Sequence, residues 1–106
     1  MTVEITDANI KDVIASGKPV VIDIWAVWCG PCRMLGKIVD KFEEEYDGRI
    51  TIGKLDAGDE KNENLCADLG VINIPTLLFY NNGELVHRHV GYLAENELRQ
   101  LFDSIL

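Results

Sequence analysis

Residues Val20–Trp25 are β-branched, aliphatic or aromatic, with the single exception of Asp23. Such a run indicates a strand that is buried on both faces, as is typical of the centre of a sheet. Cys29-Gly30-Pro31-Cys32 follows this run, and apolar residues at helical spacing come next. This strand–turn–helix unit constrains the fold most, because a strand buried on both faces needs helices on each side of its sheet.

The rest of the chain alternates predicted strands and helices. Strands are expected at 3–5, 20–25, 50–55, 76–80 and 84–90, and the apolar residues at helical spacing predict helices that include 10–14, 34–42, 65–69 and 98–105. Thr6 or Asp7 is expected to cap the first helix, and residues 56–64 are expected to form a polar loop. The order predicts parallel strands joined by crossovers, and Asn82-Gly83 predicts an antiparallel hairpin. We therefore expect an α/β fold in one domain, residues 1–106, with a mixed sheet of about five strands flanked by four helices on both faces.

Charge and composition exclude several classes of protein. The net charge is −8 with scattered acids, which argues against nucleic acid and anionic membranes as partners. The longest apolar run, residues 20–28, is too short to span a bilayer. Residues 1–9 carry neither a basic start nor a long apolar stretch, so no secretion signal is predicted and a cytoplasmic location is expected.

The pair Cys29 and Cys32 has two common meanings, half of a zinc site or a redox couple. A structural zinc ion needs four ligands, and the other candidates are Cys66, His87 and His89. The two histidines alternate on one predicted strand and Cys66 lies on a separate helix, so we predict a redox couple and no metal. The histidines are interpreted as a solvated strand face. Cys66 is interpreted as a buried structural thiol, with a regulatory thiol as the alternative.

The two cysteines are predicted to have different roles. Cys29 precedes a helix, where free N–H groups and the helix dipole favour the nucleophilic thiolate. Pro31 suits the first turn of that helix, and Gly30 leaves room for a protein substrate to approach. Cys32 lies one turn further in, so Cys29 is expected to attack a disulfide and Cys32 to resolve the mixed disulfide. Asp23, an acid within an apolar strand, is predicted to exchange a proton near neutral pH.

Several segments together resemble the thioredoxin family. They are Trp25-Ala26-Val27-Trp28-Cys29-Gly30-Pro31-Cys32-Arg33-Met34, Ile74-Pro75-Thr76 and Val90-Gly91, together with Asp23 and Lys54. The resemblance implies a cis Ile74–Pro75 bond beside the redox pair and a buried Lys54 partnered with Asp23. It also implies that the protein substrate is bound by Trp28, Gly30, Pro31, Ile74, Pro75 and Gly91.

The family resemblance further implies a function and partners. The chain would reduce disulfide-containing proteins and would be reduced again by a thioredoxin reductase, which draws electrons from NADPH through a flavin or from ferredoxin. The chain itself contains no G-x-G-x-x-G and no P-loop, so no cofactor is predicted. A disulfide oxidase or isomerase, a binding module built on the same surface, and a zinc-binding structural domain are the alternatives. A monomer is expected.

Some positions depart from the family pattern. Lys37 stands where the active-site helix usually has a proline, and it follows Gly36, so the usual kink is expected to be lost or made differently. Ile24 replaces a common aromatic residue, Asn73 replaces a small one, and Leu93 stands where a capping Ser or Thr is common. The loop 56–64 is slightly longer than usual.

Overall fold

The computed structural model describes residues 2–106, and Met1, the first residue of the expected domain, lies outside the described residues. The elements are β1 (Val3–Glu4), α1 (Ile10–Ile14), β2 (Val20–Trp25), α2 (Gly30–Glu45), β3 (Thr51–Asp56), a 3₁₀ turn (Glu60–Asn62), α3 (Glu63–Asp68), β4 (Thr76–Asn81), β5 (Glu84–Val90) and α4 (Glu95–Ser104). This order confirms the predicted sequence of strands and helices, with the 3₁₀ turn added.

The five strands form one mixed sheet in the order β1-β3-β2-β4-β5. β3 pairs in parallel with β1 and β2, whereas β4 is antiparallel to β2 and β5. β2 is therefore the central strand, as its unbroken apolar run predicts. Its register places Asp23 directly beside Lys54 of β3.

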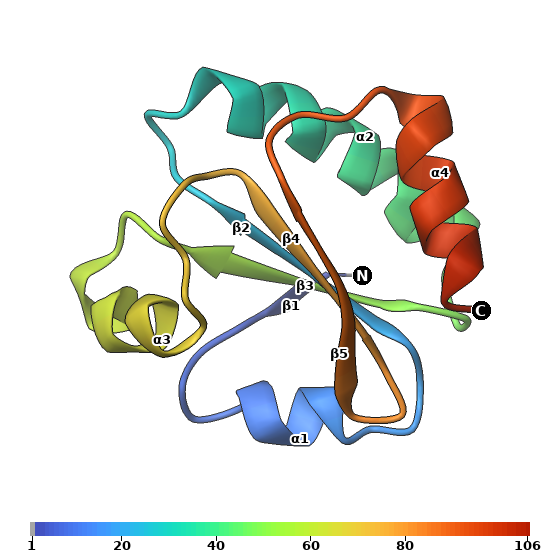
Figure 1. Cartoon of the computed structure of the whole chain (residues 1–106), viewed down its shortest axis with the longest axis horizontal. Coiled ribbons are helices and arrows are strands. Elements are labelled where there is room, and N and C mark those ends of the chain that lie inside the picture. The colour runs from blue at the N-terminus through green and yellow to red at the C-terminus, as the bar shows by residue number, and fades with distance from the viewer. Residues whose placement is uncertain (1) are drawn as a thin grey trace.

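Helices cover both faces of this sheet (Figure 1). α2 and α4 pack on one face, through Leu35, Val39, Phe42, Leu98 and Phe102. α1 and α3 pack on the other face, where Ile10 and Leu65 meet the buried residues Ile22 and Ile24 of β2. Since side chains alternate along a strand, Asp23 points to the opposite face from Ile22 and Ile24, toward α2.

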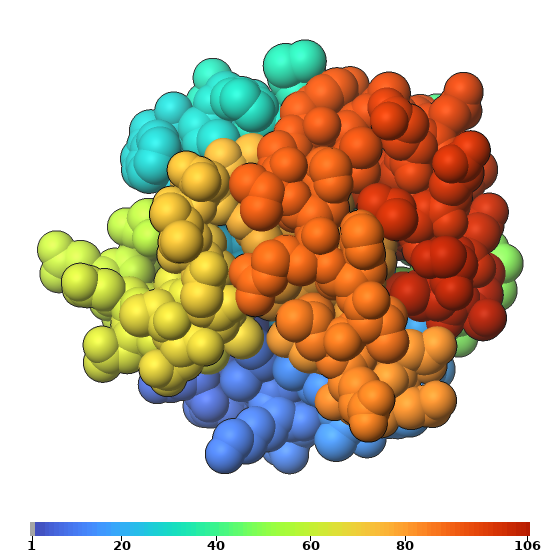
Figure 2. Space-filling view, viewed as in Figure 1, coloured from blue at the N-terminus to red at the C-terminus, as the bar shows by residue number. Residues whose placement is uncertain are grey.

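The hairpin between β4 and β5 turns at the predicted dipeptide. Asn82 and Gly83 both have positive φ, 54° and 80°, as a two-residue turn of this hand requires. β5 is an edge strand, and Figure 2 shows it on the surface together with the C-terminal segment. Leu85, Val86 and Val90 of this strand are exposed.

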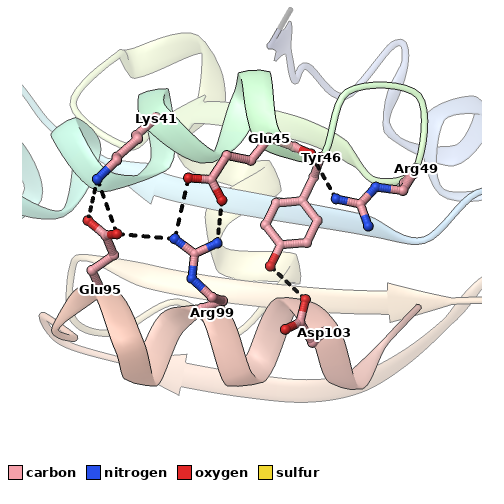
Figure 3. Close-up of polar contacts among 7 residues, drawn as sticks. All are labelled: Lys41, Glu45, Tyr46, Arg49, Glu95, Arg99 and Asp103. Atoms are coloured by element: carbon pink, nitrogen blue, oxygen red, sulfur yellow. Dashed lines mark hydrogen bonds and ion pairs between the residues drawn. The ribbon is translucent and has the colours of Figure 1, made fainter.

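A network of polar contacts joins α4 to α2 (Figure 3). Arg99 pairs with Glu45 on α2 and with Glu95 one turn earlier on α4, and Lys41 reaches Glu95 at 3.0 Å. The buried Tyr46 donates its hydroxyl hydrogen to Asp103 at 2.6 Å. These contacts hold the C-terminal half of α2 against α4. The redox pair lies at the opposite, N-terminal end of α2.

Two local expectations are corrected by the structure. The residue before α1 is Asn9 rather than Thr6 or Asp7, and its side-chain oxygen accepts from the Thr6 N–H. Residues 56–64 are not simply a loop, because the 3₁₀ turn and the start of α3 lie within them. α2 is one continuous helix through Gly36 and Lys37.

Candidate active site

The redox pair lies where β2 ends and α2 begins. Cys29 is the N-cap of α2, and its sulfur accepts a hydrogen bond from the Cys32 N–H at 3.2 Å. Pro31 lies in the first turn, where a missing N–H costs nothing. Cys29 and Cys32 form a disulfide with their Cα atoms 5.2 Å apart, and both residues are buried, with exposed fractions of 6% and 3%.

The loop before β4 lies against the Cys29 side of the pair. The Ile74–Pro75 peptide bond is cis, as the family resemblance implies. The Ile74 carbonyl oxygen is 4.0 Å from the Cys29 sulfur. The Gly91 N–H donates to the Pro75 carbonyl at 2.8 Å, and Gly91 has a φ of 101° that favours glycine. The structure therefore brings Cys29, Ile74, Pro75 and Gly91 together, although they come from three separate segments.

An apolar rim borders this side of the disulfide. Trp28 is 71% exposed, and Val27 beside it is exposed as well. Pro31 is exposed and Gly30 is half-buried, so the outer surface of the first turn is open. Large apolar side chains that face water beside a reactive sulfur suit contact with a protein segment.

Cys32 faces a different environment from Cys29. It lines a cavity of about 330 Å³ with Asp23, Trp25, Arg33, Gly36, Lys37, Asp40 and Lys54. Asp23 is 1% exposed, and no residue of 2–106 hydrogen-bonds its Oδ1 atom. Burial raises the pKa of Asp23 from its ordinary value of 3.8 to about 6, Lys54 opposes that rise, and Asp40 adds to it. A carboxyl with this pKa changes its protonation near neutral pH.

The partner of Lys54 differs from the one expected. Its side chain is half-buried, with 27% exposed, and its Nζ atom lies 2.8 Å from Oδ1 of Asp40 rather than on Asp23. The physical reason is that Asp40 offers a solvated carboxylate, whereas pairing with Asp23 would draw the ammonium into the buried end of the cavity. Asp40 was not singled out from the sequence. The spacing of Cys32, Gly36 and Asp40 could have identified Asp40 as a residue of the site, because residues four apart lie along one side of a helix.

The remaining candidate residues lie away from this site. Cys66 is half-buried rather than buried, and burial raises the pKa of its thiol. His87 is exposed, but His89 is half-buried. The prediction that both histidines lie on a solvated strand face is therefore correct only for His87. His87 and His89 line a cavity together with Leu93 and residues of α4. Across residues 2–106, no group of three or more His, Cys, Asp or Glu side chains is placed to hold a metal ion.

The fold and the site define a class of protein. A disulfide at the start of a helix, next to a cis-proline loop and an apolar rim, belongs to a dithiol–disulfide oxidoreductase with a mixed α/β sheet. The family model for thioredoxin matches residues 1–104. The chain belongs to the thioredoxin family, and its chemistry is thioredoxin dithiol–disulfide exchange.

Curated relatives agree with this assignment over nearly the whole length of this chain. A thioredoxin of Alicyclobacillus acidocaldarius is 34% identical, over 99% of this chain and 98% of that protein. A thioredoxin of Synechocystis sp. is 36% identical, over 99% of this chain and 97% of that protein. A bifunctional thioredoxin reductase/thioredoxin of Mycobacterium leprae is 38% identical over 99% of this chain, which matches 23% of that protein. No helix within residues 2–106 is long and apolar enough to cross a membrane.

Proposed function

We propose that the chain is a general reductant of protein disulfides, in which Cys29 attacks the target and Cys32 releases it. The observation that carries this proposal is the difference in surroundings between the two sulfurs. Cys29 caps α2 and lies beside the Ile74 carbonyl and the exposed rim, whereas Cys32 lines the cavity of Asp23. The cap hydrogen bond and the helix dipole stabilise a negative charge on the Cys29 sulfur.

The reaction then proceeds in two exchanges. The Cys29 thiolate attacks one sulfur of the target disulfide, the target S–S bond breaks, and the displaced target thiolate takes a proton from water. A mixed disulfide now joins Cys29 to the target. Cys32 gives its proton to the Asp23 carboxylate, and its thiolate attacks the Cys29 sulfur, which releases the second target thiolate. The target gains two electrons, and the chain is left with the Cys29–Cys32 disulfide.

Asp23 is suited to accept that proton because it lines the same cavity as Cys32 and has a pKa of about 6. The cavity volume of about 330 Å³ leaves room for water to relay a proton between the two groups. Lys54 lies next to Asp23 on the neighbouring strand and supports its ionised form. Asp23 and Lys54 are thus assigned to the proton transfer, and the two cysteines to the exchange.

Substrate binding is assigned to the surface around Cys29. Trp28 and Pro31 are exposed and Gly30 is half-buried next to Cys29 in the chain, and the loop of Ile74, Pro75 and Gly91 lies beside the Cys29 sulfur. The backbone of the cis Ile74–Pro75 segment lies beside the Cys29 sulfur, where an extended stretch of target chain could pair with it, as in strand addition. Such contacts depend little on target sequence, which suits a general reductant.

A trapping experiment tests the two roles. Cys32→Ser should accumulate a mixed disulfide between Cys29 and a target such as insulin, visible on a non-reducing gel. Cys29→Ser should trap no target, and Cys66→Ser should exchange as fast as the unmodified chain, since it makes the same chemical change outside the site. Trapping by Cys29→Ser instead of Cys32→Ser would reverse the roles, and trapping by neither would refute the mechanism.

We also propose a thioredoxin reductase as the electron donor. A relative that carries both functions in one chain, the bifunctional thioredoxin reductase/thioredoxin, supports this partner. A purified reductase with NADPH should reduce the Cys29–Cys32 pair catalytically. A ferredoxin-linked reductase is the other outcome of the same assay, run with photoreduced ferredoxin.

A disulfide oxidase or isomerase is the second candidate function, because the same two exchanges can run in reverse. The reduction potential separates the candidates. Equilibrated against glutathione, a cytosolic reductant should have a potential below that of the cytosolic pool, and an oxidant should have one above it. We propose further that residues 1–106 act as a single monomeric domain in the cytoplasm. Sedimentation of the chain at micromolar concentration tests the monomer.

A further inference from the structure

The ion pair between Lys54 and Asp40 connects two elements that both border the cavity. Lys54 is on β3, where it is the register partner of Asp23. Asp40 is on α2, two turns after Cys32. The two charged atoms are 2.8 Å apart, and both residues line the cavity together with Asp23.

The carboxyl groups of Asp23 and Asp40 both lie near Lys54, and Lys54 contacts only that of Asp40. Asp40 is largely exposed, at 63%, so its carboxylate keeps its hydration while it holds the ammonium. Asp23 is 1% exposed, and its Oδ1 atom receives no hydrogen bond from residues 2–106. An ammonium that turned from Asp40 to this oxygen would give the buried carboxylate the opposite charge that it lacks.

We propose that Asp40 is a positioning residue, which holds the Lys54 ammonium at the rim of the cavity and thereby controls when Asp23 carries a proton. This proposal rests on the proton-accepting role proposed for Asp23. The contact of Asp40 in this arrangement is with Lys54. It acts on the exchange through Lys54, and through Lys54 on Asp23.

The other charged groups around the cavity have different positions. Arg33, on the first turn of α2, donates to the Val27 carbonyl at 2.9 Å, so its guanidinium is held over the loop before α2. Lys37 is exposed on α2 and lines the same cavity as Asp40. Cys32 is the remaining titratable group, and its disulfide removes it from titration in the oxidised protein. Burial, Lys54 and Asp40 are the three influences on the pKa of Asp23, with Lys54 and Asp40 acting in opposite directions.

The test is a direct titration of Asp23 in the oxidised protein. Carboxyl ¹³C shifts of selectively labelled aspartate report its midpoint without any activity assay, and Asp23→Asn identifies the signal. Asp40→Asn should lower the midpoint by roughly one pH unit, because the freed ammonium approaches Asp23. Asp40→Glu should keep it close to that of the unmodified chain, since a carboxylate is retained. Asp7→Asn removes the same charge from an exposed residue before α1, on the other face of the sheet, and should leave the midpoint unchanged.

A second background separates positioning from simple charge. Asp40 raises the pKa of Asp23 partly through its own charge, and this effect persists without Lys54. In Lys54→Met, Asp40→Asn should therefore lower the midpoint by less than half as much as in the unmodified chain. An equal shift in both backgrounds, or no shift in either, overturns the positioning role.

Failure of the proton-accepting role of Asp23 and failure of the positioning role of Asp40 give different results. If Asp23→Asn leaves the pH dependence of target release unchanged, the proton-accepting role of Asp23 fails, whatever Asp40→Asn does to the titration. If Asp23→Asn abolishes that dependence and Asp40→Asn leaves the Asp23 midpoint in place, only the role of Asp40 fails. Where both hold, the rate of target release in Asp40→Asn should show its pH dependence shifted downward by the same amount as the ¹³C midpoint.

Discussion

Replacement of Asp23 by asparagine should stabilise the folded protein at pH 8. Burial raises the pKa of Asp23 from 3.8 to about 6, so the folded state resists ionisation of this group. At about 1.4 kcal/mol per pKa unit, that difference corresponds to about 3 kcal/mol of unfolding free energy, as an order of magnitude. Asparagine has nearly the shape of the protonated acid and carries no charge, so it escapes this cost.

The sign of the pH dependence follows from the same shift. Between about pH 4 and pH 6 the folded state binds more protons than the unfolded state, so the contribution of Asp23 to stability falls as the pH rises. Well below pH 4 the carboxyl is protonated in both states and the cost vanishes. The stability difference between Asp23→Asn and the unmodified chain should therefore be small at pH 3.5, grow through pH 5 and become constant above about pH 7.

Urea denaturation at a series of pH values measures this difference, with the disulfide intact so that Cys32 does not titrate. Asp7→Asn serves as the control for a change in net charge, and its stability should follow that of the unmodified chain. A difference that is equal at pH 3.5 and pH 8 would mean that the gain comes from packing. A loss of stability at pH 8 would refute the conclusion that burial dominates the environment of Asp23.

Three further substitutions test the packing around the site and the core by urea denaturation of the oxidised protein. Gly36→Ala should stabilise by about 0.5–1 kcal/mol, because Gly36 lies inside α2 and a Cβ atom there meets nothing within 4 Å; a lowered midpoint would contradict this. Gly53→Ala should destabilise by about 1–3 kcal/mol, because its Cβ atom would lie 2.6 Å from Cγ1 of Ile5; an unchanged midpoint would mean that Ile5 moves freely. Tyr46→Phe removes the 2.6 Å hydrogen bond to Asp103 and should cost about 1 kcal/mol, with no loss expected if water replaces that bond.

Short-range patterns in the sequence predict much of this fold. The apolar run of β2 identifies the central strand, and Asn82-Gly83 identifies the hairpin, because each signal comes from residues that are adjacent in the chain. The position of Cys29 as the N-cap of α2 follows from the same kind of pattern. These features are local, so no knowledge of the packed structure is needed to find them.

The partner of Lys54 could not be predicted in this way. A lysine side chain reaches several neighbours, and its choice between Asp23 and Asp40 depends on which carboxylate keeps its hydration. His89 gives a second example, since its place on β5 predicts exposure, but it is half-buried in a cavity that it shares with Leu93 and residues of α4. Both depend on how separate elements pack against one another.

The position of Asp23 in the strand explains why an unfavourable buried acid belongs at this place in the fold. Side chains of β2 alternate between the two cores, so Ile22 and Ile24 face α1 and α3, whereas Asp23 faces α2 and the cavity of Cys32. A carboxyl moved by one residue would lie in the wrong core, and one moved by two residues toward Val21 would enter the packed cluster under α2 and α4. Trp25 lines the same cavity but is only half-buried, so position 23 is the place on the central strand where a fully buried acid borders Cys32. The burial that costs stability there is the same burial that raises its pKa toward neutral pH, so the proposed proton transfer and the predicted instability have one physical origin.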